Sequence, residues 1–214
     1  MNATTAAPVL RATALACVRG ERPLFSDISF TLAGGTLLQV RGANGSGKTS
    51  LLRIVCGLLL PEAGAISWNG RGIRELGEEY REVLAYVGHL NAIKDELDPE
   101  ENLSYFARLA GLPAAPADLA GALHAVELDD RDRLPCKLLS QGQRRRVAIA
   151  RLTLSRARPL WVLDEPFAGL DARGVVLTQS LIEAHLAAGG IALLTTHQEA
   201  AISAGAIQDL ELRP

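Results

Sequence analysis

The stretch GANGSGKT, residues 42–49, decides the fold of this chain of 214 residues. It matches the phosphate-binding loop pattern G-x-x-x-x-G-K-[ST], with the strand-like TLLQVRG (36–42) before it and a helical run (48–56) after it. Glycines in such a loop let backbone N–H groups point inward at the N-terminus of a helix, where they bind phosphate. The stretch therefore predicts a nucleotide triphosphate site.

Two side chains in this stretch are not explained by an ordinary glycine turn. Lys48 can supply a positive charge to the β- and γ-phosphates of a nucleotide, and the hydroxyl of Thr49 can reach a Mg²⁺ ion. The candidate nucleotide-binding residues of the loop are Gly42, Ala43, Asn44, Gly45, Ser46, Gly47, Lys48, Thr49 and Ser50.

A second motif, LWVLDEP at residues 160–166, supplies the carboxylates that such a site requires. Its apolar residues predict a buried strand, and two adjacent acids at the end of a core strand are costly unless they serve an ion or a reaction. We expect Asp164 to hold hydrated Mg²⁺ and Glu165 to orient and deprotonate the attacking water. A helix cap with exposed acids is the alternative.

A histidine follows another apolar strand. The segment LLTTH ends at His197, which we expect at the same edge of the sheet, where its imidazole can donate a hydrogen bond to the γ-phosphate. A lone histidine is more often structural, but this one directly follows a strand beside two phosphate motifs, which favours a role in the site.

The order of elements predicts an α/β fold. β-rich stretches separated by glycine turns open the chain and predict an N-terminal antiparallel β portion. GAISWNG (64–70) and VLAYVG (83–88) follow as a further pair of strands. Continuous apolar strands at 36–42, 159–164 and 190–196 alternate with helices, which indicates a mainly parallel core sheet covered on both faces.

A helical insertion of about residues 89–156 interrupts this α/β core. In DPEENLSYFARLAG, Asp98, Pro99 and Glu101 occupy the positions of a capping box with proline at the first helical position. PADLAGALHAVEL and SQGQRRRVAIARLTL predict two more helices. Because the sequence has no internal repeat, we expect one domain spanning residues 1–214.

The composition limits the partners. No apolar run reaches the roughly 18 to 20 residues that cross a bilayer, and residues 1–17 lack the pattern of a signal peptide. The formal net charge of −2 creates no field that attracts nucleic acid. Cys17, Cys56 and Cys136 form no CxxC pair, which favours reduced, buried thiols in a cytosolic protein.

The string LSQGQRRR, residues 139–146, places a cationic helical run behind Ser140 and Gly142. Ser140 can cap that helix and also donate to a phosphate, while the Gly142 N–H and the helix dipole add positive potential. For Arg144, Arg145 and Arg146 we expect pairing with nearby acids or the subunit surface, and no nucleic-acid partner.

The motif order GANGSGKT, LSQGQ, LDEP, GLD and TTH resembles the ATP-binding subunits of ABC transporters over nearly the whole chain. LSQGQ is similar to the family signature LSGGQ, with Gln141 in place of one glycine. The resemblance implies a P-loop NTPase fold of the ABC type, ATP and Mg²⁺ as cofactors, and ATP hydrolysis. It also implies that Ser140 and Gly142 contact ATP on the phosphate loop of a second copy, so that a dimer encloses the nucleotide.

Two positions depart from the family pattern. Arg19 stands about where the family usually has an aromatic residue that stacks on adenine, and its guanidinium plane can stack instead. His89, in YVGHLN, stands where the family typically has a glutamine that offers oxygen to Mg²⁺. Because imidazole is a softer ligand, we expect His89 to sense phosphate or a membrane partner through hydrogen bonds.

Within the family, GH in YVGHLN and the terminal TTHQ most resemble the ATPases of the cytochrome c maturation haem exporter. That implies a peripheral subunit on the cytoplasmic face of the bacterial inner membrane, held by integral membrane subunits of the cytochrome c maturation system that contact residues 89–105. Acids in that region serve either this contact or helix-start electrostatics; they are Glu96, Asp98, Glu100 and Glu101. An exporter ATPase for another substrate, a lipid or a drug, is the alternative function.

Overall fold

The computed structural model describes residues 7–129, 133–197 and 201–212. Residues 1–6 of the N-terminal segment and Gln198 of the TTHQ string lie outside the described residues. Among those described, no helix is long and apolar enough to cross a membrane. Cys17, Cys56 and Cys136 are buried free thiols, as expected.

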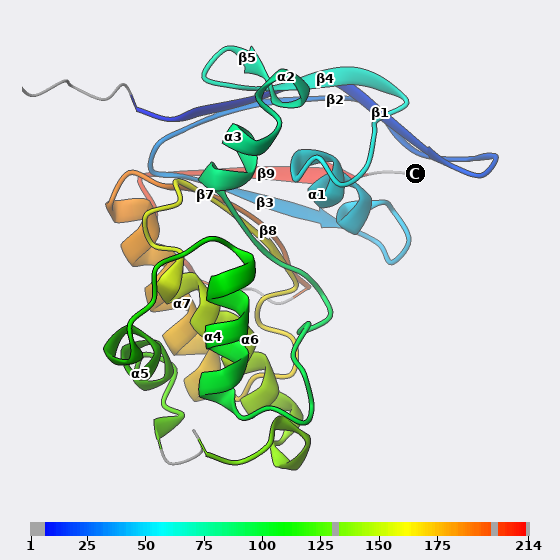
Figure 1. Cartoon of the computed structure of the whole chain (residues 1–214). Helices are drawn as coiled ribbons and strands as arrows, with labels where there is room; N and C mark the ends of the chain where they lie inside the picture. Colours follow the sequence, from blue (N-terminus) through cyan, green and yellow to red (C-terminus); the bar gives the residue numbers. More distant parts are fainter. Residues whose placement is uncertain (1–6, 130–132, 198–200, 213–214) are drawn as a thin grey trace, which may run out of the picture.

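Two sheets form the framework (Figure 1). The antiparallel sheet has four strands in the order β2-β1-β4-β5, which are β1 (Val9–Arg19), β2 (Arg22–Ala33), β4 (Ala63–Trp68) and β5 (Arg71–Gly72). The parallel sheet has five strands in the order β6-β7-β8-β3-β9, which are β3 (Thr36–Gly42), β6 (Leu84–Val87), β7 (Leu160–Asp164), β8 (Ile191–Thr195) and β9 (Ala206–Leu212). The expected α/β fold is confirmed.

The two strands expected in GAISWNG and VLAYVG are present but belong to different sheets. β4 pairs with β1 in the antiparallel sheet, whereas β6 pairs with β7 in the parallel sheet. Two short helices that the sequence analysis did not predict, α2 (Ile73–Leu76) and α3 (Glu78–Val83), carry the chain from one sheet to the other. Their few residues give too short an apolar period to recognise in sequence.

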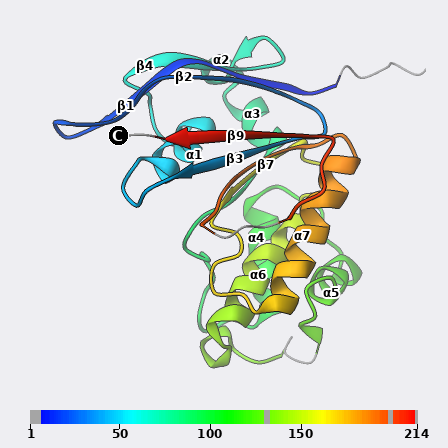
Figure 2. The same ribbon diagram turned by 180° about the vertical axis from the view of Figure 1, so that it is seen from behind.

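The remaining helices occupy both sides of the parallel sheet. They are α1 (Lys48–Val55), α4 (Pro99–Leu109), α5 (Pro116–His124), α6 (Gln141–Leu154) and α7 (Ala172–Ala187). Both views show α1 between the two sheets and α4 to α7 on the opposite side of the parallel sheet (Figures 1 and 2). Helix α4 begins with the expected capping box, in which Asp98 Oδ1 accepts from Glu101 N at 2.7 Å.

The inner strands β7 and β8 of the parallel sheet bury both of their faces. In β7, Leu160 and Val162 belong to the hydrophobic core shared with α1 and the antiparallel sheet, whereas Trp161 and Leu163 belong to the core shared with α4 to α7. This alternation explains the uninterrupted apolar run, because successive side chains of a strand point to opposite faces. It also leaves the carboxyl end of β7 as the place where polar residues emerge.

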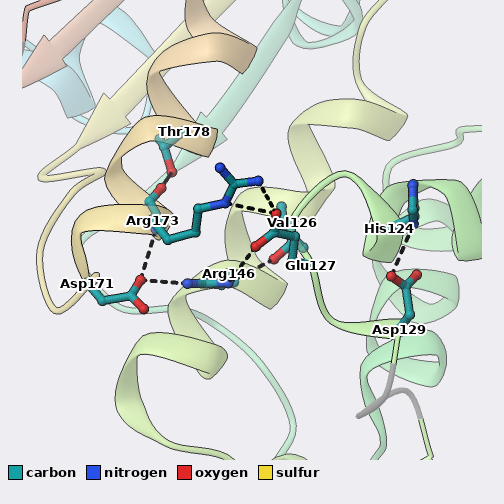
Figure 3. A network of polar contacts seen from close by, with 9 residues as sticks. His124, Val126, Glu127, Asp129, Arg146, Asp171, Arg173 and Thr178 are labelled. Carbon is teal, nitrogen blue, oxygen red and sulfur yellow. Dashed lines mark hydrogen bonds and ion pairs between the residues drawn. The ribbon is translucent and has the colours of Figure 1, made fainter.

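A polar network joins α6 to the start of α7 (Figure 3). Arg146 Nη2 donates to Asp171 Oδ1 at 2.5 Å, and the same oxygen accepts from Gly174 N at 2.8 Å to cap α7. These hydrogen bonds, that from Arg146 first, lower the pKa of Asp171. Arg173 pairs with Glu127, which follows α5. The network therefore fixes the two helices relative to each other.

A buried histidine stabilises the other end of α7. The His185 ring stacks on Trp161, with centroids 4.0 Å apart and planes within 6°, and its Nε2 lies 3.2 Å from the Ile191 carbonyl oxygen. Burial lowers the pKa of His185, although backbone hydrogen bonds oppose the shift. The folded protein therefore holds this imidazole in its neutral form more strongly than the unfolded chain does.

We predict that His185 makes folding sensitive to acid. Because its pKa is lower in the folded state, the unfolded chain binds more protons, so the free energy of unfolding falls as pH drops below about 6.5, by at most about 1.4 kcal/mol per pH unit. His185→Gln should flatten this dependence in denaturant titrations between pH 5 and pH 8, by the loss of one titrating group. His124→Gln, at an exposed histidine, is the control for removing an imidazole. Equal slopes for wild type and His185→Gln would contradict the assignment.

Candidate functional site

The phosphate loop connects β3 to α1 and is shaped by close packing. Gly47 caps α1 with φ of 99°, in the left-handed region that favours glycine. A Cβ at this position would lie 3.0 Å from both Leu24 Cβ and Phe25 Cδ1 in β2. The glycine is therefore required by its backbone conformation and by its contact with the antiparallel sheet.

Lys48 is buried within this loop. Its side chain bends back so that Nζ donates to the carbonyl oxygens of Gly42, at 2.8 Å, and Ala43, at 3.2 Å. These contacts hold the ammonium group at the N-terminus of α1, where backbone N–H groups and the helix dipole also favour an anion.

Asp164 lies at the end of β7 and is 2% exposed. Its Oδ2 accepts from the Thr49 hydroxyl at 2.9 Å, and its Oδ1 accepts from the Thr195 hydroxyl at 2.8 Å. Two hydroxyl donors compensate the burial of this carboxylate. The contact between Thr49 and Asp164 also brings together the two residues expected to hold Mg²⁺.

Glu165 follows directly and adopts a strained backbone. Its φ of 51° is in the left-handed region, which is uncommon for a residue with a side chain. Its N–H donates to Thr195 Oγ1 at 2.9 Å. Its Oε1 is buried without a hydrogen bond within the described part of the chain, and His197 Nε2 lies 3.4 Å away.

These residues line one cavity of about 520 Å³, within the size range of small-molecule sites. The expected site residues found in its wall are Arg19, Asn44, Gly45, Gly47, Lys48, Thr49, Ser50, His89, Asp164, Glu165 and His197. Of the loop residues, Gly42, Ala43 and Ser46 do not line the cavity. The structure thus brings the two positions that depart from the family pattern, Arg19 and His89, to the same cavity as the phosphate loop.

Ser140 and Gly142 are not part of this cavity wall. They lie at the start of α6, which belongs to the helical part of the molecule, across the parallel sheet from α1 (Figure 1). Ser140 is exposed and caps α6, since its Oγ accepts from Gln143 N at 3.2 Å. A Cβ on Gly142 would lie 3.0 Å from the Gly169 carbonyl oxygen, so the glycine permits close approach of the GLD segment.

The expectation for the three arginines is correct at two positions and wrong at the third. Arg144 pairs with Asp95, and Arg146 pairs with Asp171. Arg145 is 3% exposed and instead binds backbone carbonyl groups, among them those of Asp164 and Glu165. The Arg145 side chain differs from its two neighbours because it lies on the side of α6 that faces the parallel sheet.

Two residues of the site, Thr195 and Arg145, were not predicted from the sequence. Thr195 stands beside Asp164 because β7 and β8 are paired in that register. The signal for Thr195 was a polar residue at the end of an apolar strand, in LLTTH, but nothing local indicated its partner. No sequence signal separated Arg145 from its two arginine neighbours.

The oxygen atoms of the site suit Mg²⁺. Thr49 Oγ1 and Asp164 Oδ2 are hard ligands already in contact, and Mg²⁺ typically takes one or two protein ligands together with water and substrate phosphates. Glu165 Oε1, buried and without a hydrogen bond among the described residues, is placed to accept a proton or hydrogen bond from a water in the cavity. The arrangement can therefore bind a nucleotide and activate water beside it.

Comparison with known proteins agrees with this geometry. Residues 25–168 match the family model described as ABC transporter. The chain is similar to the Cytochrome c biogenesis ATP-binding export protein CcmA of Dechloromonas aromatica, with 52% identity over 95% of this chain and 100% of the relative, and to that of Nitrosomonas europaea, with 50% identity over 95% of each.

Solved structures of similar fold include an ATP binding subunit of an ABC transporter, with 30% identity and a TM-score of 0.78 over 88% of this chain and 79% of that chain. A putative ABC transporter ATP-binding protein from Pyrococcus furiosus has 25% identity and a TM-score of 0.81, over 94% and 97% of the two chains.

We predict that the Thr195 hydroxyl stabilises the buried carboxylate. Thr195→Val keeps the shape but removes both hydrogen bonds, so the free energy of unfolding should fall by about 1–3 kcal/mol. Thr195→Ser restores the hydroxyl and should recover most of that loss. Denaturant titrations of the three proteins measure the effect. A Thr195→Val protein as stable as Thr195→Ser would show that the hydroxyl does not support Asp164.

Proposed function

Because this chain belongs to the ABC transporter family of ATP-binding proteins, we propose that it is the ATP-hydrolysing subunit of the export complex of cytochrome c biogenesis, with haem as the cargo. The observation that carries the proposal is about 50% identity, along nearly the whole length, to ATP-binding export proteins of that system. The complete phosphate loop and its adjacent carboxylates supply the chemistry.

Five side chains of the cavity wall have roles in this proposal. Lys48 and the loop N–H groups bind the phosphates of ATP, while Thr49 and Asp164 hold Mg²⁺. The metal offsets the charge that develops on the phosphates. Glu165 orients the attacking water and accepts its proton, and His197 donates a hydrogen bond to the γ-phosphate. The contact of 3.4 Å between Glu165 and His197 supports a shared task.

Arg19 and His89 also line the cavity. Arg19 lines the cavity and stacks its guanidinium plane on adenine. His89 hydrogen-bonds to phosphate or to a membrane subunit. Both assignments rest on their position in the same cavity as the phosphate loop.

A second copy of the chain completes the site. The exposed Ser140 and the N-terminus of α6 present a hydroxyl and a helix dipole at a surface separate from the phosphate cavity. ATP held by Lys48 of one copy then meets Ser140 and Gly142 of the other. ATP binding closes the dimer and hydrolysis reopens it, because the two states differ in their affinity for the nucleotide.

Integral membrane subunits of the cytochrome c maturation system bind residues 89–105 and hold the chain at the cytoplasmic face of the inner membrane. Leu90 and Tyr105 support this surface, since 81% and 44% of their areas are exposed. Three of the four acids nearby have other partners: Asp98 and Glu101 form the capping box, and Glu96 pairs with Lys137 at 2.6 Å. We therefore assign the contact to the apolar side chains.

An exporter of a lipid or drug remains the alternative function. The cytochrome c biogenesis names of the relatives favour the first function. Copurification from the native host separates the two, because the membrane subunits that accompany the chain identify the complex.

We predict that Glu165→Gln traps an ATP-bound dimer. The amide is of similar size but cannot accept the proton of water, so hydrolysis should fall by at least about 100-fold while ATP still binds. With Mg²⁺ and ATP, size-exclusion chromatography with light scattering should show a long-lived dimer. Lys48→Ala combined with Glu165→Gln is the control and should remain monomeric. A monomeric Glu165→Gln protein with ATP bound would contradict the shared site.

We predict that Leu90→Ser weakens attachment to the membrane subunits. The change removes an exposed apolar side chain that burial in a complex would stabilise by about 1.5–3 kcal/mol, so copurification should fall several-fold. Leu58→Ser is the matched control, because Leu58 is 66% exposed but lies beyond the end of α1. Equal recovery with both variants would place the contact elsewhere.

A further inference from the structure

Arg145 is a buried cation that binds backbone atoms. It lies in α6, five positions after the helix cap Ser140, and is 3% exposed. Its Nη2 donates to the carbonyl oxygens of Asp164, at 3.0 Å, and Glu165, at 2.8 Å, and its Nε donates to that of Pro166, at 3.3 Å. Three successive peptide units after β7 are thus bound to one side chain.

The same guanidinium also binds the segment that carries His89. Its Nη1 donates to the Gly88 carbonyl oxygen at 2.9 Å and to Asn91 Oδ1 at 3.1 Å. Gly88 and Asn91 flank His89 on both sides, so Arg145 fixes this short segment against α6. Arg145 makes no hydrogen bond with the side chain of His89 or of Glu165; it binds the neighbours of His89 and the backbone of Glu165.

The contact with Glu165 lies where the backbone is strained. Glu165 has φ of 51°, and this conformation needs support from its surroundings. Thr195 Oγ1 accepts a hydrogen bond from the Glu165 N–H, and Arg145 donates one to the Glu165 carbonyl oxygen. These two contacts hold the backbone of Glu165 in the conformation that places its carboxylate in the cavity wall.

A lysine cannot replace this arrangement. The guanidinium is planar and presents five N–H donors in fixed directions, whereas an ammonium group is a single point with three donors. Five acceptors on two separate chain segments match the guanidinium. Burial lowers the pKa of Arg145, while the nearby carboxylates of Asp164 and Glu165 oppose the shift.

We propose that Arg145 is a positioning residue for ATP hydrolysis, which ties α6 to the backbone of Glu165 and to the segment carrying His89. The inference rests on the proposed function, since it concerns the same reaction. In the proposed dimer, Ser140 at the cap of α6 contacts the nucleotide of the second copy. Through Arg145, the same helix is hydrogen-bonded to the backbone that orients the carboxylate of Glu165. Arg145 acts on the rate of hydrolysis and has no contact with ATP.

The test separates turnover from nucleotide binding. In the purified full-length chain, Arg145→Lys should lower kcat for ATP by about 10-fold or more, because small displacements of a catalytic group are costly, while KM and the Kd for Mg·ATP change by less than about threefold. Arg158→Lys is the matched control. Arg158 also donates to two backbone carbonyls, those of Leu84 and Ala110, but lies outside the cavity wall. Its kcat should equal that of wild type.

A second variant keeps the test decisive if Arg145→Lys does not fold. Asn91→Leu removes one acceptor of the guanidinium and should lower kcat by about threefold. When both proteins fold, the double variant should be no slower than Arg145→Lys alone, because the two residues act through one contact.

Three results would overturn the inference: wild-type kcat in folded Arg145→Lys or, failing that, in Asn91→Leu; an equal loss in Arg158→Lys; or independent, multiplying effects in the double variant. A wild-type chain that does not hydrolyse ATP would instead contradict the proposed function itself.

Discussion

A carboxylate buried at the end of a core strand must be surrounded by donors, and the site is organised by how Asp164 meets this constraint. One hydroxyl comes from Thr49, at the start of α1, and the other from Thr195, at the end of β8. Arg145, from α6, binds the carbonyl oxygen of the same residue. The phosphate loop, the parallel sheet and the helical part of the molecule therefore meet at Asp164.

In the proposed function, the chain has two functional surfaces, the cavity and the cap of α6. The phosphate loop and the acids line the cavity, whereas Ser140 at the cap of α6 is exposed and does not line it. Arg145 lies between them, on the same helix as Ser140 and bonded to the peptide of Glu165. In the proposed function, such a chain binds a nucleotide in its own cavity and offers its Ser140 to another copy.

Local sequence predicted the parts whose structure is local. The phosphate loop, the buried strand ending in Asp164 and the capping box at Asp98 follow from patterns of a few residues, and each is present. Thr195 and Arg145 were not predicted, because their importance arises from strand register and from the packing of α6 against the sheet. The placement of β4 and β6 in different sheets was not predicted either, because the two helices between them, α2 and α3, are too short to show a helical spacing of apolar residues.

The most direct test of this account mixes two inactive variants and measures their ATPase activity. Lys48→Ala removes the phosphate ligand, and Ser140→Arg blocks the cap of α6. If each site takes one half from each copy, mixed dimers contain one intact site, and activity should return to about a quarter of the wild-type rate, since half of randomly paired dimers are mixed. If the mixture remains inactive although mixed dimers form, both halves act within one chain and the account is contradicted.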